Sequence, residues 1–263
     1  MEPTGQCVQR MFSSIAHRYD LLNHLLSLGI DRRWRRKTVA ALPAVPGGAY
    51  LDVATGTADV ALEIARKVPE AGQIVGIDFS LPMLRRGREK VEESRRSRLV
   101  HLIDGDALRL PFGDSVFDGL TIAFGLRNLA DPLQGLQEMA RVLKSGGSLS
   151  ILEFATPSHS WLRSLYLFYF LRLLPRVGGF ISGNPQAYRY LPGSVLKFPE
   201  REALMVLLKR AGLENVAYRN LTGGIAVLYS GSKAKACPAP SLLLRPGTRF
   251  PGEDERGRRR GPL

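Results

Sequence analysis

The chain has very few cysteines, no long apolar run and no excess of acidic residues. Its two cysteines, Cys7 and Cys237, lie near opposite ends of the 263 residues, which gives neither a disulfide framework nor metal-ligand spacing. No apolar run approaches the length of about 18 residues that a membrane-spanning helix needs. The first residues also lack the basic-then-apolar pattern of a signal peptide. We therefore expect a cytoplasmic protein without a bound metal.

Basic residues outnumber acidic ones by 37 to 24, for a formal net charge of +13. Much of the excess lies at the two ends. Residues 1–40 carry seven Lys and Arg against three Asp and Glu, and residues 231–263 carry eight against three. Three interpretations stay open: a solvated surface with a disordered tail, attraction to anionic lipid headgroups, and binding of nucleic acid.

Hydrophobic residues make up 44% of the chain, enough for a sizeable core. From residue 50 on, expected strands and helices alternate, which is typical of a parallel α/β sheet. A closing hairpin completes a mostly parallel seven-stranded sheet with helices on both faces. Residues 145–147 are expected to end the helix before them as a C-cap turn. The expected strands are 50–54, 73–77, 99–103, 117–123, 148–153, 213–219 and 224–230, and the helices are 58–68, 82–96, 132–143 and 199–211.

The chain divides into three regions. Residues 1–46 are expected to form an N-terminal helical cover, in which residues 27–29 interrupt an amphipathic helix and Asp31 caps a second, basic one. Residues 47–233 form the main domain, with a helical insertion at about 156–198. Its apolar stretch at 161–174 fits core packing, a lid over an apolar substrate, or a helix in a membrane interface. Residues 234–263 are rich in Pro, Gly and Arg and are expected to be a disordered tail.

The most informative motif is a buried strand, a tight turn at Gly56, a helix, and a second strand ending at Asp78. This arrangement is typical of a nucleotide site at the carboxyl edge of a parallel sheet. A dinucleotide fingerprint needs three glycines, but Ala54 and Ala58 occupy the flanking positions. Two acids, Asp52 and Asp59, also lie beside the turn, where they suit a ligand with ammonium and sulfonium charge. The motif therefore favours S-adenosylmethionine over NAD.

Three residues of this motif have expected roles, and two of them also have a structural alternative. The Gly56 backbone is expected to approach the methionine part of the ligand, or merely to make a tight turn. Thr57 offers a hydroxyl and an N–H to the amino-acid end of the ligand. Asp78 is expected to accept both ribose hydroxyls, and its alternative is a role at the N-terminus of the following helix.

Two further loops follow strands that end at the same edge. Asp106 and Ala107 are placed to recognise the adenine edge, although an Asx turn would also explain the aspartate. Arg127 and Asn128 come after the strand at 117–123, next to Gly125, which permits a close approach. The alternative for Arg127 is a structural ion pair with Asp20 or Glu153.

With these residues in hand, the chain resembles the UbiE/MenG family of quinone-biosynthesis C-methyltransferases over roughly residues 8–233. The resemblance implies a Rossmann-like class I S-adenosylmethionine-dependent methyltransferase fold. It also implies cofactor contacts at Thr57, Asp78, Asp106 and Ala107. Departures from the family pattern are Asp31 for a usual His, Ser145 for Pro, and Ala123 and Ala155 for Ser. The matching blocks are Tyr19–Asn23 with Ser27 and Trp34, Phe124–Asn128, Arg141–Ala155, and Tyr190–Gly224.

The activity implied by the resemblance is methyl transfer from S-adenosylmethionine to a ring carbon of demethylmenaquinol, giving menaquinol and S-adenosylhomocysteine. The equivalent step in ubiquinone or phylloquinone biosynthesis is an alternative. Arg127 is a candidate for stabilising the quinol oxygen as its proton leaves, with Tyr19, Asp20 and His17 as candidates for moving that proton.

The expected partners are a prenylated quinol and an anionic membrane surface at the inner face of the cell membrane. Nucleic acid is not an expected partner of the methyltransferase, and a homodimer stays open. Two other classes stay as alternatives: a basic nucleic-acid-binding module and an NAD-linked reductase, the latter opposed by the missing glycines.

Overall fold

The computed structural model describes Ser27, residues 29–173, Arg176 and residues 192–235. Several predictions fall outside these residues: the first amphipathic helix with Tyr19, Asp20 and His17, and the C-terminal tail from residue 236. The domain boundaries after residues 46 and 233 stay predictions.

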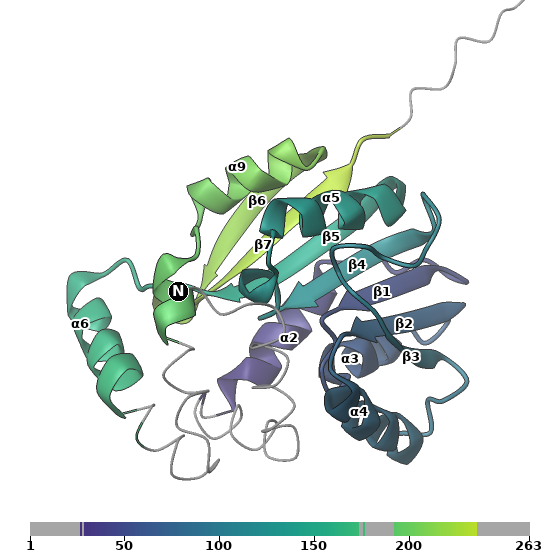
Figure 1. The fold of residues 1–263 in the computed structure, drawn as a ribbon, viewed down its shortest axis with the longest axis horizontal. Coiled ribbons are helices and arrows are strands. Elements are labelled where there is room, and N and C mark those ends of the chain that lie inside the picture. Colours follow the sequence, from purple (N-terminus) through teal and green to yellow (C-terminus); the bar gives the residue numbers. More distant parts are fainter. Residues whose placement is uncertain (1–26, 28, 174–175, 177–191, 236–263) are drawn as a thin grey trace, which may run out of the picture.

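Seven strands form one sheet in the order β3-β2-β1-β4-β5-β7-β6, with β7 antiparallel to both of its neighbours and the remaining pairs parallel (Figure 1). Every strand expected from the sequence is present, so the predicted fold class is confirmed. The β6–β7 pair is the predicted hairpin. The strands are β1 (Ala49–Val53), β2 (Gln73–Asp78), β3 (Val100–Asp104), β4 (Phe117–Ala123), β5 (Leu143–Phe154), β6 (Leu213–Leu221) and β7 (Ala226–Lys233).

Helices cover both faces of the sheet, with α2, α3 and α4 on one side and α5 and α9 on the other (Figure 1). Side chains of β1 alternate between the two cores, because successive residues of a strand point to opposite faces. Leu51 belongs to the core that contains Leu136 of α5, whereas Tyr50 belongs to the core that contains Ile64 of α3. The helices are α2 (Ile30–Ala40), α3 (Asp59–Lys67), α4 (Leu81–Glu93), α5 (Pro132–Val142), α6 (Ser160–Phe168) and α9 (Glu202–Arg210), with short turns η1 (Leu126–Asn128) and η3 (Thr222–Gly224).

The start of α2 differs from the prediction. Gly29 is the N-cap, because its φ of 74° lets the backbone turn into the helix, and Asp31 lies inside the first turn. The Asp31 carboxylate accepts a hydrogen bond from the Ser27 hydroxyl at 2.8 Å. The prediction that Asp31 caps the helix is therefore wrong. On the next turn, Trp34 Nε1 donates to Thr222 Oγ1 at 2.9 Å and so joins α2 to η3.

The expected C-cap turn at residues 145–147 is also wrong. Helix α5 ends at Val142, and the Ser-Gly-Gly segment lies within β5. The pairing of β4 with β5 shifts register there, between Phe117–Leu143 and Gly119–Ser148. Gly146, with a φ of 76°, supplies the left-handed residue of this irregularity.

The insertion contains α6, which continues as a π-helical turn, η2 (Tyr169–Leu173), and stands at the side of the molecule away from the sheet (Figure 1). Tyr166 and Phe170 are buried, whereas Trp161, Leu165 and Phe168 are 71%, 61% and 64% exposed. Core packing therefore accounts for only one face of this helix. None of the helices in the described part of the chain is long and apolar enough to cross a membrane.

Candidate active site

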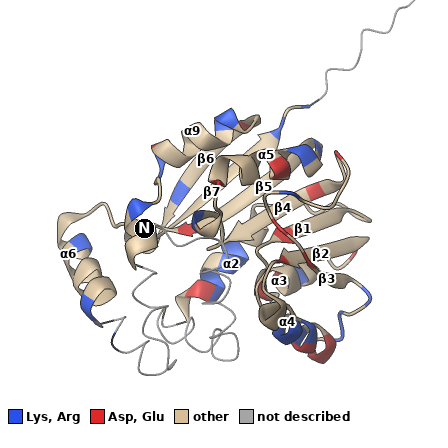
Figure 2. Ribbon diagram, viewed as in Figure 1, with Lys and Arg blue, Asp and Glu red and all other residues tan. Residues whose placement is uncertain are grey.

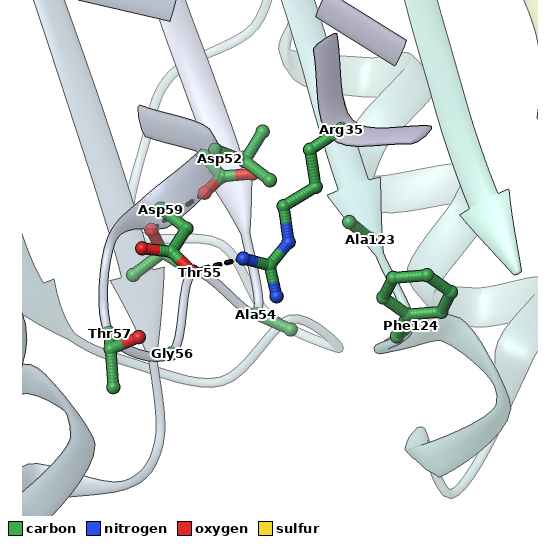
Figure 3. A pocket seen from close by; sticks show the side chains of 10 residues that line it. Arg35, Asp52, Ala54, Thr55, Gly56, Thr57, Asp59, Ala123 and Phe124 are labelled. Carbon is green, nitrogen blue, oxygen red and sulfur yellow. Dashed lines mark hydrogen bonds and ion pairs between the residues drawn. The ribbon is translucent and has the colours of Figure 1, made fainter. Parts of the chain in front are cut away.

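A cleft opens where β1 and β4 lie side by side and their loops leave the sheet in opposite directions (Figure 3). In open α/β sheets, this switch in strand order is where ligands bind. The cleft is lined by Arg35, Asp52, Ala54, Thr55, Gly56, Thr57, Asp59, Val60, Ala123 and Phe124. The structure thus brings Asp52, Gly56 and Thr57 together, as the sequence predicted.

The loop after β1 follows a glycine-like path although it has only one glycine. Gly56 has a φ of 56°, and Ala54 and Ala58 also take left-handed φ values of 52° and 66°. Left-handed conformations cost about 1 kcal/mol for residues with a Cβ, so the surrounding structure holds these alanines in place. A Cβ on Gly125 would lie 2.5 Å from the Ala54 Cβ. The space at Gly125 is therefore used by the neighbouring loop.

Asp78 lies at the end of β2 and connects two loops of the site. Its Oδ2 accepts from the Gly56 N–H at 2.8 Å, and its Oδ1 accepts from the Ser80 N–H at 2.9 Å, at the N-cap of α4. Burial raises the pKa of Asp78 above its usual range, and these backbone hydrogen bonds oppose that rise. The Phe79 N–H is a third backbone donor to this carboxylate, which has about four acceptor positions, so Asp78 retains capacity to accept from the ribose.

Asp52 is almost completely buried on β1. Its two oxygens accept from the hydroxyls of Thr55 and Thr121, each at 2.7 Å. Burial raises the pKa of Asp52 to about 6, although both hydroxyls favour the charged form. At neutral pH this carboxylate is a buried negative charge at the base of the cleft.

Asp59 behaves differently from the expectation that it is available to a cationic ligand. Its carboxylate is paired with Arg35 of α2 and with Lys90 of α4, and Arg35 also lies 3.5 Å from Asp31. Lys90 donates to Thr57 Oγ1 at 3.2 Å as well. The charge of Asp59 is therefore compensated within the protein, which leaves Asp52 as the anionic group of the cleft.

Arg35 and Lys90 are site residues that sequence reasoning missed. The Asp31–Arg35 spacing of four residues on a helix was the available signal for an ordered arginine. The partner on α3 is separated from Arg35 by 24 positions, and no local pattern connects them.

In the loop after β3, Asp106 forms the Asx turn that was the structural alternative to adenine recognition. Asp106 Oδ1 accepts from the Leu108 N–H at 2.9 Å, which is the predicted Asx turn, and Ala107 is buried beside it. Adenine recognition by these two residues stays a prediction.

Arg127 forms the structural pair that the sequence left open. Its Nη1 lies 2.8 Å from Glu153 Oε2 and donates to the Phe124 carbonyl at 2.6 Å, and both charged side chains are at least 96% buried. The Asn128 amide donates to the same carbonyl. The pair fixes the guanidinium next to Phe124 at the edge of the cleft. Its catalytic role stays a prediction, as do the roles of Tyr19, Asp20 and His17, which lie outside the described residues.

A row of aromatic rings leads from the cleft toward α6. Phe124 stacks on Phe154 at 4.3 Å between centroids, and Trp34 packs against both rings. Phe154 lies 6.4 Å from Phe170, which stacks on Tyr166 at 4.9 Å. This aromatic row forms an apolar wall that reaches the cleft at Phe124. The described part of the chain has no group of three acidic, histidine or cysteine side chains that could hold a metal ion.

The sheet order and the cleft define the fold of S-adenosylmethionine-dependent methyltransferases. The solved [4+2]-cyclase SpnF is similar with a TM-score of 0.66 at 18% identity, over 89% of this chain and 98% of that one. A methyltransferase from Thermotoga maritima, titled a possible histamine N-methyltransferase, is similar with a TM-score of 0.59 at 20% identity, over 85% and 98%. Because one of these neighbours is a cyclase, the fold alone does not specify the reaction.

The chain belongs to the ubiE/COQ5 methyltransferase family, which it matches over residues 1–233. It is 51% identical to the Geobacter sp. (strain M21) protein named ubiquinone/menaquinone biosynthesis C-methyltransferase UbiE, over 87% of this chain and 97% of that one. It is 49% identical to the Deinococcus radiodurans protein named demethylmenaquinone methyltransferase, over 87% and 93%. The predicted family is confirmed, and the protein is a methyltransferase.

Proposed function

We propose that the enzyme methylates a ring carbon of demethylmenaquinol with S-adenosylmethionine, giving menaquinol and S-adenosylhomocysteine. The observation that carries the proposal is the identity of 51% and 49%, over most of both chains, to relatives named for this step in quinone biosynthesis. The Geobacter relative is named for ubiquinone as well, so the ubiquinone precursor is the second candidate acceptor.

The polar groups of the cleft fit S-adenosylmethionine. Asp78 has lone pairs left for the ribose hydroxyls, and the buried Asp52 carries the negative charge that suits an ammonium group. Gly56 and Thr57 would lie along the methionine part, and Asp106 and Ala107 beside the adenine. When bound, S-adenosylmethionine supplies an electrophilic methyl group on a positively charged sulfur.

The protein's part in the reaction is to align the quinol, stabilise its ionised oxygen and keep water away. The reduced ring is required because loss of a proton from its oxygen increases the electron density on the adjacent carbon. Arg127, held by Glu153 beside the cleft, supports that ionised oxygen directly or through a water. Tyr19, Asp20 or His17 of the N-terminal cover would accept the proton.

A methyl-transfer assay tests the proposal. The purified protein is incubated with methyl-labelled S-adenosylmethionine and a short-chain demethylmenaquinol kept reduced by dithionite, in parallel with the corresponding ubiquinone-type benzoquinol. We expect label in the naphthoquinol, none with the oxidised quinone, and none with Asp78→Ala. Transfer to the benzoquinol alone would replace menaquinone by ubiquinone as the pathway, and transfer to neither would contradict the proposal. Quinone profiling of a deletion strain checks the result in the cell.

We also propose that α6 brings the enzyme to an anionic membrane surface, where its prenylated substrate resides. The exposed rings of Trp161 and Phe168 share one side of the helix with Leu165, while Arg163 and Arg172 are exposed along the same segment. Figure 2 shows basic positions, in blue, along the ribbon of α6. Apolar side chains flanked by arginines suit the boundary between acyl chains and anionic headgroups.

Vesicle flotation tests this contact. We expect the protein to float with phosphatidylglycerol vesicles at low salt and less with phosphatidylcholine, and Trp161→Ser with Phe168→Ser to abolish flotation. Val206→Ser is the matched control, because Val206 is 55% exposed on α9, away from this helix. Equal flotation of the double variant and the control variant would contradict a role for α6.

A further inference from the structure

Two buried side-chain atoms in the described part of the chain have no hydrogen-bond partner: Nε of Arg127 and the hydroxyl oxygen of Tyr166. The Arg127 side chain is 4% exposed and Tyr166 is 7% exposed. Buried polar groups are nearly always paired in folded proteins, so an exception calls for a physical reason. A bound substrate that completes both hydrogen bonds is such a reason.

Tyr166 belongs to the aromatic row that begins in the cleft, and Arg127 packs against it. The Arg127 guanidinium carbon lies 5.5 Å from the centre of the Phe154 ring. Phe170 packs on the same ring, and Tyr166 stacks on Phe170 with an interplanar angle of 19°. The two unpartnered atoms are therefore carried by side chains that pack around one apolar wall, which starts at Phe124.

Both groups are hydrogen-bond donors. The Nε–H of an arginine can only donate. Burial and the nearby Glu200 raise the pKa of Tyr166 above its usual range, with Arg127 opposing the rise, so the phenol keeps its proton at neutral pH. The neighbouring carboxylates already have partners, since Glu153 pairs with Arg127, and Glu200 accepts from Thr156 and pairs with Arg201. What the donors lack is an acceptor, and an oxygen with negative charge is the strongest one.

We propose that Tyr166 is an acceptor-binding residue whose hydroxyl, together with Arg127 Nε, donates to the ionised oxygen of the quinol while the aromatic row packs against its ring. The inference rests on the proposed function and specifies which residues recognise the acceptor. Tyr166 exchanges no proton in this role. It keeps its hydrogen and stabilises the phenolate from which the ring carbon attacks.

Tyr166→Phe tests the role because it removes the hydroxyl and keeps the stacked ring. If no protein group satisfies the hydroxyl, its removal should leave the melting temperature of the ligand-free protein unchanged or raised. We expect the kcat/KM for a short-chain demethylmenaquinol to fall about tenfold to a hundredfold, as when one donor to a developing oxyanion is removed. The KM for S-adenosylmethionine should not change. Tyr218→Phe is the control, since its hydroxyl bonds to Glu202 on the surface.

Binding provides a readout that does not depend on turnover. Calorimetry with 1,4-dihydroxynaphthalene, kept reduced and added with S-adenosylhomocysteine, should show about tenfold weaker binding to Tyr166→Phe than to the unchanged protein. Unchanged binding and turnover in Tyr166→Phe would overturn the inference. A lower melting temperature with weaker S-adenosylhomocysteine binding would also overturn it, because the hydroxyl would then be structural. The remaining outcome is that 1,4-dihydroxynaphthalene binds more weakly to Tyr166→Phe while the unchanged protein transfers no methyl group. It would support the inference and contradict only the proposed reaction.

Discussion

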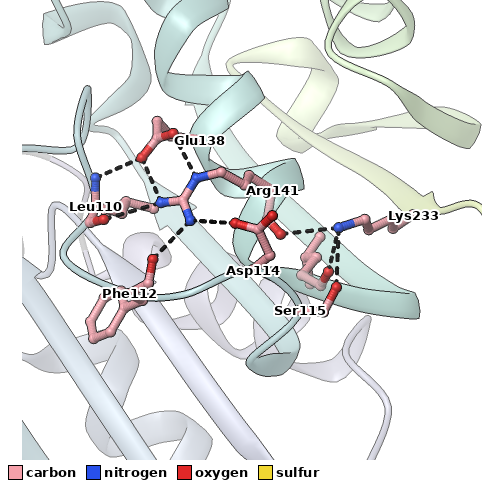
Figure 4. A network of polar contacts seen from close by, with 8 residues as sticks. Leu110, Phe112, Asp114, Ser115, Glu138, Arg141 and Lys233 are labelled. Carbon is pink, nitrogen blue, oxygen red and sulfur yellow. Dashed lines mark hydrogen bonds and ion pairs between the residues drawn. The ribbon is translucent and has the colours of Figure 1, made fainter.

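Two arginines at opposite edges of the sheet show how differently this protein uses the same side chain. Arg141 of α5 donates from all three guanidinium nitrogens, to Glu138, to Asp114 and to the carbonyls of Leu110 and Phe112 (Figure 4). Arg127, at the cleft, is more deeply buried and yet leaves Nε without a partner among the described residues.

On the role proposed for Arg127, the difference separates a structural cation from one that is prepared for a ligand. Arg141 and the adjacent Lys233, which donates to the carbonyls of Arg141 and Leu143, tie a loop to the ends of α5 and β7. A side chain whose hydrogen bonds are already complete has little left to offer a substrate. A side chain with an unpaired donor keeps part of its capacity to bind a ligand, at a cost in the stability of the protein.

The largest effect is expected at the cleft. Arg127→Lys keeps the positive charge beside Glu153 and removes the Nε–H. We expect kcat to fall about 100-fold, because a hydrogen-bond donor to the ionised oxygen of the quinol is lost. Methyl transfer to a soluble quinol, measured by mass spectrometry, checks this. Unchanged kcat would make Arg127 as structural as Arg141.

The matching change at the opposite edge should act on stability. Arg141→Lys loses the planar fork that holds Glu138 and two carbonyls, and we expect the free energy of unfolding to fall by about 2 kcal/mol. The bond to Asp114 contributes little, since that carboxylate is 75% exposed. Urea denaturation measures the loss, and the kcat of the folded variant should equal that of the unchanged protein. A lower kcat in Arg141→Lys would contradict the distinction between a structural Arg141 and a ligand-binding Arg127.

Protonation of Asp52 should change cofactor binding by a smaller amount. With a pKa of about 6, the carboxylate becomes charged as the pH rises through 6. Affinity for S-adenosylhomocysteine, which carries an ammonium group, should therefore increase about tenfold between pH 5 and 7. Calorimetry should show a flat profile for Asp52→Asn. A slope that persists in this variant would assign the titration to another group.

The same pKa has a consequence for stability with the opposite pH trend. A folded pKa above the unfolded value of 3.8 means that the folded state binds the proton more tightly. This contribution is present below pH 4 and is lost as the pH rises through 6. The unfolding free energy of the unchanged protein, relative to Asp52→Asn, should fall over that interval.

The smallest effect is expected at Lys233. Lys233→Met removes hydrogen bonds to two backbone carbonyls near solvent, and we expect a loss of about 0.5–1 kcal/mol in the free energy of unfolding without a change in kinetics. Thermal denaturation of Lys233→Met and Arg141→Lys in parallel measures how much each residue contributes to the stability of this network. A loss equal to that of Arg141→Lys would assign the stability of this edge to Lys233.

Local patterns predicted the strands and the positions of Asp78 and Gly56, because alternation and turn residues are properties of short segments. They failed where a distant contact decides the outcome. Asp59 was expected to serve the ligand, but Arg35 from another helix compensates it. The glycines at 146 and 147 were expected to end a helix, but they lie within β5, between Leu143 and Ser148, which both pair with β4. The unpartnered nitrogen of Arg127 depends on the side chains packed around Phe154, which no spacing along the chain reveals.

The hydrogen bond between Trp34 and Thr222 joins residues 188 positions apart. Helix α2, which brings Arg35 to the cleft, is therefore fastened to a turn that lies just before the last strand. During synthesis, most of the sheet leaves the ribosome before residue 222 exists. A growing chain consequently lacks this fastening of the cleft wall until residue 222 has been synthesised.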